Sequence, residues 1–569
     1  MKNISIFIKL PVVFGILILS NYCLAAKVVN LTPANFASTW GTIQPGDKVI
    51  FSAGDYRAEL LLLANKKWSV DTPTTFSAVR PGVVFIKGSD IISDWKNIGG
   101  SRYVRDWNGV EPEQVFVGGI PLVQLGGTIF AGFPNDPKSI YKGMHASSGG
   151  IWPGRIAYVA GTAMPAESFF YNAAEKKLYL NTLKNVATQK VEVSVRRRPF
   201  YAEGVNGITL DGLIIEHSNT SYYGRGAALT IIGSDNIIQN VTVRNADLAG
   251  IQTVGDRNKV RNSILAYNGQ AGLIMRGTAN EVTGVNASFN NSRKFNKWWE
   301  AGGFKFVGNG GLQASRVSGN YVVGNQGDGI WFDWNNKGNF ITENVVAYNA
   351  GFGIHYEASK EAAIMDNYVY GNGQRGVFLA DSANSTISHN MVIANSLEGV
   401  AAVYTGRRDD DGKEFGGGSN KVDSNIIGWN GGTASFIMAM PAPSGGGSDV
   451  NVFLGAPKAV RFSIGYPTSL KPAVSSLSGW IKISGMDAMS VAAEVVMPTA
   501  LANSLARRST DIDWSEVRSL AANLRKNLQP TPTVANSLMG SSVTTLKSIP
   551  NMELPTTSKI DAAGPRVNK

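Results

Sequence analysis

Cysteine is almost absent from this chain. Its 569 residues contain one, Cys23, which excludes an intramolecular disulfide. A small scaffold stapled by disulfides is therefore excluded, and packing and hydrogen bonds must hold the fold together. Histidine is also rare: there are four, and none shows the spacing of metal ligands. We accordingly expect no metal and no other cofactor.

One acidic run is the only hint of a bound cation. Asp409, Asp410 and Asp411 directly follow Arg407 and Arg408. The run lacks the ligand spacing of an EF-hand and contains its own counter-charges. Calcium stays open as an alternative, but we interpret the run as a solvated loop.

Long apolar runs are missing after the N-terminus. No later stretch approaches the roughly 18 apolar residues of a membrane-spanning helix. Residues 1–25 have the pattern of a secretory signal peptide, in which Lys2 and Lys9 flank a short positive region, an apolar run follows, and Ala25 and Ala26 offer a cleavage point. We therefore predict export to the periplasm or the cell exterior, with no integral membrane segment after the signal is removed.

The formal net charge of the chain is +11. Nucleic acid is a poor partner for a protein outside the cytoplasm, so we expect none. An acidic polysaccharide would exploit this charge, although a solvated basic surface is the simpler explanation.

An internal repeat dominates the centre of the sequence. Asparagines recur there at steps of 24, 23 and 23 residues in two series: Asn320, Asn344, Asn367 and Asn390, and Asn325, Asn349, Asn372 and Asn395. Short strands, polar turns and a fixed period are typical of a β-solenoid. Asparagine suits its turns because it tolerates left-handed dihedrals and can bond the asparagine of the next coil. We predict an all-β fold, a right-handed parallel β-helix with coils of about 22–24 residues.

The repeat also divides the chain into regions. Residues 27–89 are predicted to form an N-terminal cap and the first coils, and residues 201–440 a parallel β-helix with an active-site cleft. Residues 90–200 break the period, and we assign them to an inserted β-sandwich-like domain. Residues 441–569 are predicted to be a partly helical C-terminal extension, whose Pro-, Thr- and Ser-rich end has little core-forming potential and is expected to be flexible.

Glycine-led strands place side chains on two faces of the predicted β-helix. In Gly329–Asp333 and Gly353–Glu357 the second and fourth residues should fill the core, while the third and fifth point outward. Stacking puts Asp333 and Glu357 in one outward column, with backbones about 4.8 Å apart. Retaining glycosidases need two carboxyl groups about 5–5.5 Å apart, and inverting enzymes need about 6.5–9.5 Å. Asp333 and Glu357 are therefore candidate catalytic residues of a retaining hydrolase, and their repulsion should raise the pKa of one of them.

Aromatic and charged residues accompany this pair. Aromatic rings stack on sugar faces, and Lys or Arg can bond hydroxyl groups or neutralise a carboxylate, so the group predicts a sugar-binding cleft. We interpret His355 as a hydrogen-bond donor to substrate. The candidate substrate-binding residues are Trp331, His355, Lys305, Arg276 and Phe378 from the strands, with Glu300, Trp298 and Trp299 from an insertion before Lys305.

Three stretches resemble a known family. Gly302–Lys305, Gly329–Asp333 and Gly353–Glu357, with the inserted β-sandwich after the first coils, resemble the β-helical β-xylosidases of glycoside hydrolase family 120. The resemblance would cover about residues 30–430. It implies that Asp333 is the nucleophile, that Glu357 is the acid/base, and that Lys305 and Glu300 lie in the substrate pocket.

Two other functions stay open. A polysaccharide lyase or C5-epimerase would need a base and a group that neutralises a uronate, roles that Lys305, Arg276 and His355 could fill. A non-catalytic polysaccharide-binding solenoid would need neither carboxylate for chemistry. In every case the expected partner is an oligo- or polysaccharide.

Overall fold

The computed structural model describes most of the chain. The described residues are 27–125, 163–220, 226–295, 297–298, 300–308, 310–431, 436–438, 446–456, 459–464 and 474–526. The predicted signal peptide and the end of the predicted C-terminal extension lie outside them. Among the described residues, no helix is long and apolar enough to cross a membrane.

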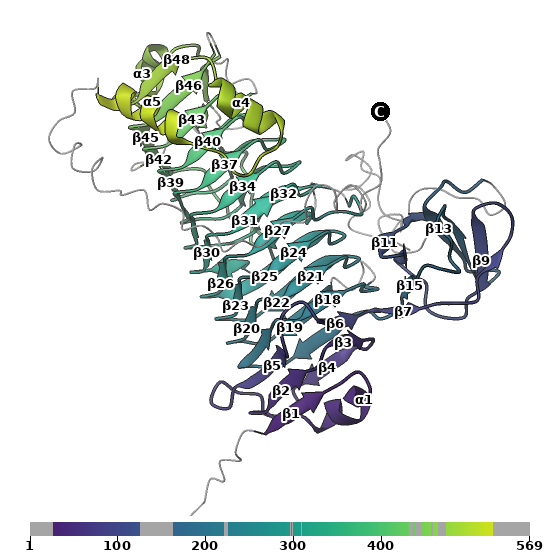
Figure 1. The fold of residues 1–569 in the computed structure, drawn as a ribbon. Helices are drawn as coiled ribbons and strands as arrows, with labels where there is room; N and C mark the ends of the chain where they lie inside the picture. Colours follow the sequence, from purple (N-terminus) through teal and green to yellow (C-terminus); the bar gives the residue numbers. More distant parts are fainter. Residues whose placement is uncertain are drawn as a thin grey trace, which may run out of the picture.

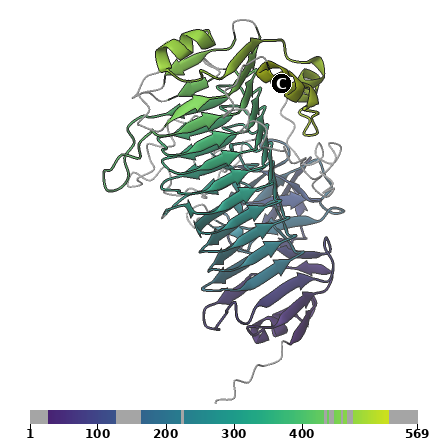
Figure 2. The same cartoon turned by 90° about the vertical axis from the view of Figure 1, so that its left-hand side faces the viewer.

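Three parallel sheets of thirteen strands each make up the body of the protein. One runs from β1 (Val28–Leu31) to β45 (Gly447–Asp449), and a second from β3 (Gly54–Tyr56) to β48 (Val491–Glu494). Each coil contributes one strand to each sheet, and the coils stack along one axis (Figures 1 and 2). The periodic sequence therefore forms the parallel β-helix that was predicted from it.

The third sheet carries the predicted catalytic residues, and we call it the site sheet. In order of pairing, its strands are β4 (Leu60–Leu63), β16 (Phe200–Glu203), β19 (Ala227–Ile232), β22 (Ala249–Val254), β25 (Ala271–Thr278), β28 (Gly302–Phe306), β32 (Asp328–Asp333), β35 (Ile354–Glu357), β38 (Val377–Ala380), β41 (Val400–Val403), β44 (Phe436–Met438) and β47 (Phe462–Ile464). A short strand, β29 (Leu312–Gln313), pairs with β25 beside them.

Two smaller sheets lie between β6 (Val84–Lys87) and β16, and project to one side of the stack (Figure 1). One contains β7 (Ser89–Ile91), β10 (Val115–Val117), β11 (Ile120–Pro121) and β15 (Val191–Ser194); the other contains β8 (Lys96–Asn97), β9 (Arg102–Asp106), β12 (Val123–Leu125), β13 (Ser168–Asn172) and β14 (Lys177–Asn181). They share a core that includes Trp107, Phe169 and Val193. β16 nevertheless pairs directly with β4, so the stack of coils continues past the insertion.

Helices cover the two ends of the stack and part of one side. α1 (Phe36–Thr39) lies at the N-terminal end and α3 (Leu477–Ser484) at the C-terminal end, while α4 (Thr499–Ala506) and α5 (Ser515–Lys526) pack near the C-terminal end against the outer face of the sheet that ends in β48 (Figure 1). The stack continues beyond residue 440, where we predicted only an extension, because β45, β46 (Val452–Gly455), β47 and β48 still pair in the three large sheets. The Gly- and Ser-rich interruption hides these last coils from a search for the repeat.

Both asparagine series form buried ladders. Asn320 donates its side-chain amide to Oδ1 of Asn344 at 2.9 Å, and Asn344 does the same to Asn367 at 2.9 Å. These asparagines do not adopt left-handed dihedrals. The left-handed residue is the one before each of them, such as Glu343 (φ 60°) before Asn344. The turn and the amide ladder thus belong to adjacent residues, which corrects our account of why asparagine recurs.

The alternation of faces on the site sheet is confirmed. Ile330, Phe332, Ile354 and Tyr356 are fully buried in the core of the β-helix. The residues between them point to the opposite face of the sheet. There the outward columns meet the insertion before β28 and the loop after β41, so part of this face is also covered.

Candidate active site

Asp333 and Glu357 end neighbouring strands in register. β32 pairs with β35 so that Asp333 lies beside Glu357, and Trp331 lies beside His355. Both carboxylates are partly exposed, with 17% and 19% of their side chains accessible to solvent. One guanidinium contacts both: Arg407 Nη2 lies 3.6 Å from Asp333 Oδ1, and its Nη1 bonds Glu357 Oε1. The predicted pair is therefore close enough to share one cation.

Lys305 fixes the charge of Asp333. Its side chain is 2% exposed, and its ammonium group donates to Asp333 Oδ2 at 2.9 Å. Burial raises the pKa of the Asp333 carboxyl, but the charge and hydrogen bond of Lys305, with the charges of Arg407 and His355, outweigh burial, so the net shift of the pKa is downward. Asp333 is accordingly held as a carboxylate, the form that a nucleophile requires.

Glu357 has a different set of neighbours. The indole N–H of Trp331 donates to Glu357 Oε2 at 2.9 Å. Nε2 of His355 lies 3.6 Å from the same oxygen and has no hydrogen-bond partner among the described residues. An imidazole at this distance can share a proton with the carboxyl group when the geometry tightens.

A buried carboxylate orients His355. Asp328, at the start of β32, is 2% exposed, and its Oδ2 lies 2.9 Å from His355 Nδ1. Its Oδ1 accepts the backbone N–H of Phe352 at 2.8 Å. Asp328 thus holds the ring with Nδ1 toward its carboxyl group and Nε2 toward Glu357. Asp328 was not predicted from the sequence, although it is an acidic residue directly before a glycine-led strand.

Aromatic rings form a column beside the carboxylates. Trp331 stacks on His355 with ring centroids 5.2 Å apart, and His355 stacks on Phe378 at 5.0 Å. Phe352 packs edge-on against His355, and Trp298 from the insertion packs edge-on against Phe352. The column is less accessible than expected of a sugar platform, because Trp331 and His355 are only 6% and 5% exposed. Trp298, 43% exposed, is the aromatic ring at the rim.

The loop after β41 contributes a residue that we predicted to be merely solvated. Arg407 lies over the ring of Trp334, bonds Glu357 and forms a longer ion pair with Asp333. Asp410 accepts a hydrogen bond from the indole N–H of Trp334 at 3.3 Å. The interpretation of residues 407–411 as a solvated loop is therefore wrong for Arg407. The mixed charges of the run gave no sign that one arginine would fold back.

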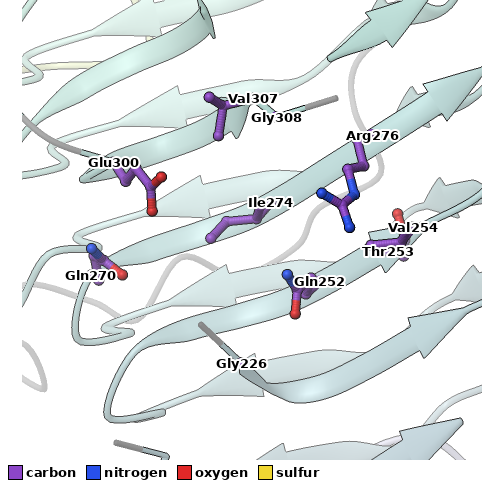
Figure 3. A pocket seen from close by; sticks show the side chains of 10 residues that line it. All are labelled: Gly226, Gln252, Thr253, Val254, Gln270, Ile274, Arg276, Glu300, Val307 and Gly308. Atoms are coloured by element: carbon purple, nitrogen blue, oxygen red, sulfur yellow. The ribbon is translucent and has the colours of Figure 1, made fainter. Parts of the chain in front are cut away.

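A hollow, seen in Figure 3, lies over β22 and β25, which precede the strands of the carboxylate pair in the site sheet. Arg276 and Glu300, both predicted to bind substrate, line it together with Gln252 and Gln270. β25 pairs with β28 so that Ile274, in the floor of the hollow, lies beside Lys305. The hollow is therefore continuous with the columns that carry Lys305 and Asp333.

One predicted substrate-binding residue is not among those that the structure describes. Trp299 lies outside the described residues. Among the described residues, no group of three or more His, Cys, Asp or Glu side chains is arranged to hold a metal ion.

Comparison with known proteins supports the fold class. A family model for a "Right handed beta helix region" matches residues 295–410, in agreement with the predicted right-handed parallel β-helix. No curated protein matches this sequence.

Solved structures resemble the chain at low identity. "The complex structure of XylC with xylose" is 13% identical, with a TM-score of 0.57 over 83% of this chain and 87% of that chain. A "Glycoside hydrolase" is 11% identical, with a TM-score of 0.47 over 76% and 97% of the two chains. A "PL6 family alginate lyase AlyGC" is 10% identical, with a TM-score of 0.41 over 78% and 53%. Identities this low show similarity of fold alone.

Proposed function

We propose that this protein is an exported glycoside hydrolase that cleaves an oligo- or polysaccharide with retention of configuration. The observation that carries the proposal is the register of Asp333 and Glu357 on neighbouring strands of the site sheet. Adjacent parallel strands lie about 4.8 Å apart, which matches the short separation of the carboxyl groups in retaining enzymes.

The first chemical step forms a covalent intermediate. Glu357 gives its proton to the oxygen of the leaving group while a carboxylate oxygen of Asp333 bonds the anomeric carbon. The bond between that carbon and the leaving oxygen breaks with its electron pair on oxygen. Lys305 supports this role of Asp333, because a paired carboxylate stays ionised at the pH at which Glu357 must carry a proton.

The second step returns both residues to their initial state. Glu357, now ionised, removes a proton from water, whose oxygen bonds the anomeric carbon as the ester to Asp333 breaks. His355 assists by sharing the proton of Glu357 through Nε2, while Asp328 holds the ring from the other side. Arg407 must leave Glu357 when substrate enters, and its partly exposed loop gives it room to do so.

Several observations favour a sugar as substrate. The rings of Trp298 and Phe378 belong to the aromatic column that includes His355, and aromatic rings stack on sugar faces. XylC, whose structure with xylose shares this fold, and the resemblance to family 120 β-xylosidases make aryl xylosides one probe to include.

A lyase or epimerase is the second candidate. The observation that favours it is the Asp328–His355 pair, because an imidazole oriented by a buried carboxylate is a common form of general base. Lys305 is a weaker candidate for the base, since it is buried and bonded to Asp333.

The test is activity against aryl glycosides and uronate polymers, with Asp333→Asn and Glu357→Gln as variants. We expect new reducing ends without unsaturated product, and a loss of at least about a thousandfold in each variant. The configuration of the first product, followed by NMR, should be that of the substrate. Unsaturated product absorbing in the ultraviolet would establish the lyase instead. Glycan binding without turnover, unchanged in both variants, would establish a binding solenoid.

A further inference from the structure

The hollow beside the carboxylates is lined by the guanidinium of Arg276 and by the carboxylate of Glu300. Arg276 projects from β25 into the hollow (Figure 3). Across the part of the chain that the structure describes, its guanidinium has no ion pair and no hydrogen bond. Two other arginines near the carboxylates do have ion pairs. Arg407 pairs with both Asp333 and Glu357, and Arg375 pairs with Glu398 at 2.7 Å.

A buried amide in the same hollow is also unsatisfied. Gln270 is 3% exposed, and its Nε2 has no hydrogen-bond partner among the described residues. Gln252 brings a second amide to the hollow from β22. Buried donors without partners are rare, and they are expected where a ligand completes the hydrogen bonds.

The hollow lies two strands away from the proposed nucleophile along the site sheet. Ile274 is in register with Lys305, and Phe306 with Phe332, so Val307 occupies the position between Arg276 and Asp333. Two steps of about 4.8 Å separate the strands of Arg276 and Asp333. A sugar chain bound along the site sheet, with one anomeric carbon at Asp333, can therefore place a neighbouring unit at Arg276.

We propose that this hollow binds a sugar unit that carries a carboxylate, a uronate, and that Arg276 recognises the carboxylate group. A planar guanidinium bonds a carboxylate through two parallel N–H groups, which gives both affinity and orientation. Gln252 and Gln270 then bond the hydroxyl groups of the same unit. This inference depends on the proposed function in one respect, because the position of the cleaved bond beside Asp333 is taken from it.

Binding of short oligosaccharides tests the inference without any need for turnover. Oligomers of galacturonate, glucuronate and mannuronate are titrated by calorimetry into the wild-type protein, beside the corresponding neutral oligomers of galactose, glucose and mannose. We expect one of the uronate oligomers to bind more tightly than its neutral counterpart. In Arg276→Gln that uronate should bind about 10- to 100-fold more weakly, while the neutral sugar is unaffected.

A matched control separates recognition from overall charge. Arg80 is exposed on the turn between β5 (Thr74–Ala78) and β6, and Arg80→Gln removes the same charge away from the hollow. The inference is overturned if Arg80→Gln weakens uronate binding as much as Arg276→Gln does. It is also overturned if uronate oligomers bind no more tightly than neutral ones. If Arg276→Gln fails to fold, Arg276→Lys replaces it, because lysine keeps the charge without the planar fork.

The two proposals fail in different ways. A uronate that binds through Arg276 but is not hydrolysed would support the subsite and overturn the hydrolase. Neutral glycosides that are cleaved through Asp333, with no preference for a uronate at any pH, would overturn the subsite and leave the hydrolase intact.

Discussion

The backbone N–H of Arg407 donates to Oδ1 of Asp381 at 3.2 Å. The backbone N–H groups of Thr405 and Gly406 donate to the same oxygen, and the hydroxyl group of Thr405 donates to Oδ2. Asp381 is 4% exposed and follows β38, one coil beyond Glu357. A single buried carboxylate therefore fixes the start of the loop that carries Arg407 to both candidate catalytic residues, and Asp381 acts as a positioning residue.

Replacing Asp381 should loosen this loop and disturb Arg407. Asp381→Ala leaves three backbone N–H groups without their acceptor, so we expect kcat/KM to fall about tenfold. The acid limb of the pH profile should also move to higher pH, because Arg407 helps to lower the pKa of Asp333. Asp381→Asn keeps one acceptor oxygen and tolerates the left-handed backbone (φ 47°), so it should restore most of the activity. An unchanged pH profile in Asp381→Ala would contradict the positioning role.

The pair Lys305 and Asp333 predicts a second pH effect. Activity requires ionised Asp333, so it is lost as the pH falls through the pKa of that carboxyl. Lys305→Met removes the largest of the contributions that lower this pKa and leaves burial, which raises it. We expect the acid limb of kcat/KM to move to higher pH and the value at neutral pH to fall on the order of a hundredfold. Lys360→Met, at an exposed site, should leave the profile in place.

The fold could be predicted because its signals are local and repeated. The spacing of the asparagines and the alternation within glycine-led strands fixed the stacking of Asp333 beside Glu357. Arg407 and Asp381 could not be found in this way, because they meet the site through a loop that lies outside the repeat. The solvent exposure of the outward columns could not be predicted either. The insertion before β28 and the loop after β41 cover side chains that a strand pattern alone would leave exposed.

The asparagine ladder should be a major source of stability. Asn344 donates to Val317 and Asn367 and accepts two hydrogen bonds from Asn320, all of them in the buried interior. Asn344→Ala leaves these groups unpaired, and we expect a loss of about 2–4 kcal/mol in the free energy of unfolding.

Denaturant unfolding measures this loss. Asn503→Ala, at an exposed position of α4, should have little effect because alanine favours helix. If Asn344→Ala lowers the free energy of unfolding no more than Asn503→Ala does, the ladder is a consequence of the fold and does not stabilise it.

A buried acid at the base of the inserted strands makes stability depend on pH. Burial raises the pKa of the Glu113 carboxyl to about 8, although Arg293 lies 3.5 Å away. A carboxyl group whose pKa is higher in the folded than in the unfolded protein stabilises the fold when it is protonated. That stability is present below the ordinary pKa of 4.5 and is lost as the pH rises toward 8 and beyond.

Thermal unfolding across this range tests the role of Glu113. We expect the melting temperature of the wild type to fall between about pH 5 and pH 9, and Glu113→Gln to remove most of that fall, because glutamine has the same shape and cannot ionise. Burial also raises the pKa of Asp247, to about 6. The part of the fall in melting temperature that occurs below about pH 6 should therefore remain in Glu113→Gln. Glu516→Gln, at an exposed position in the first turn of α5, serves as the control and should keep the wild-type profile. Parallel profiles for the wild type and Glu113→Gln would mean that Arg293 keeps Glu113 ionised in the fold, and that this ion pair, rather than a neutral acid, joins the inserted strands to the β-helix.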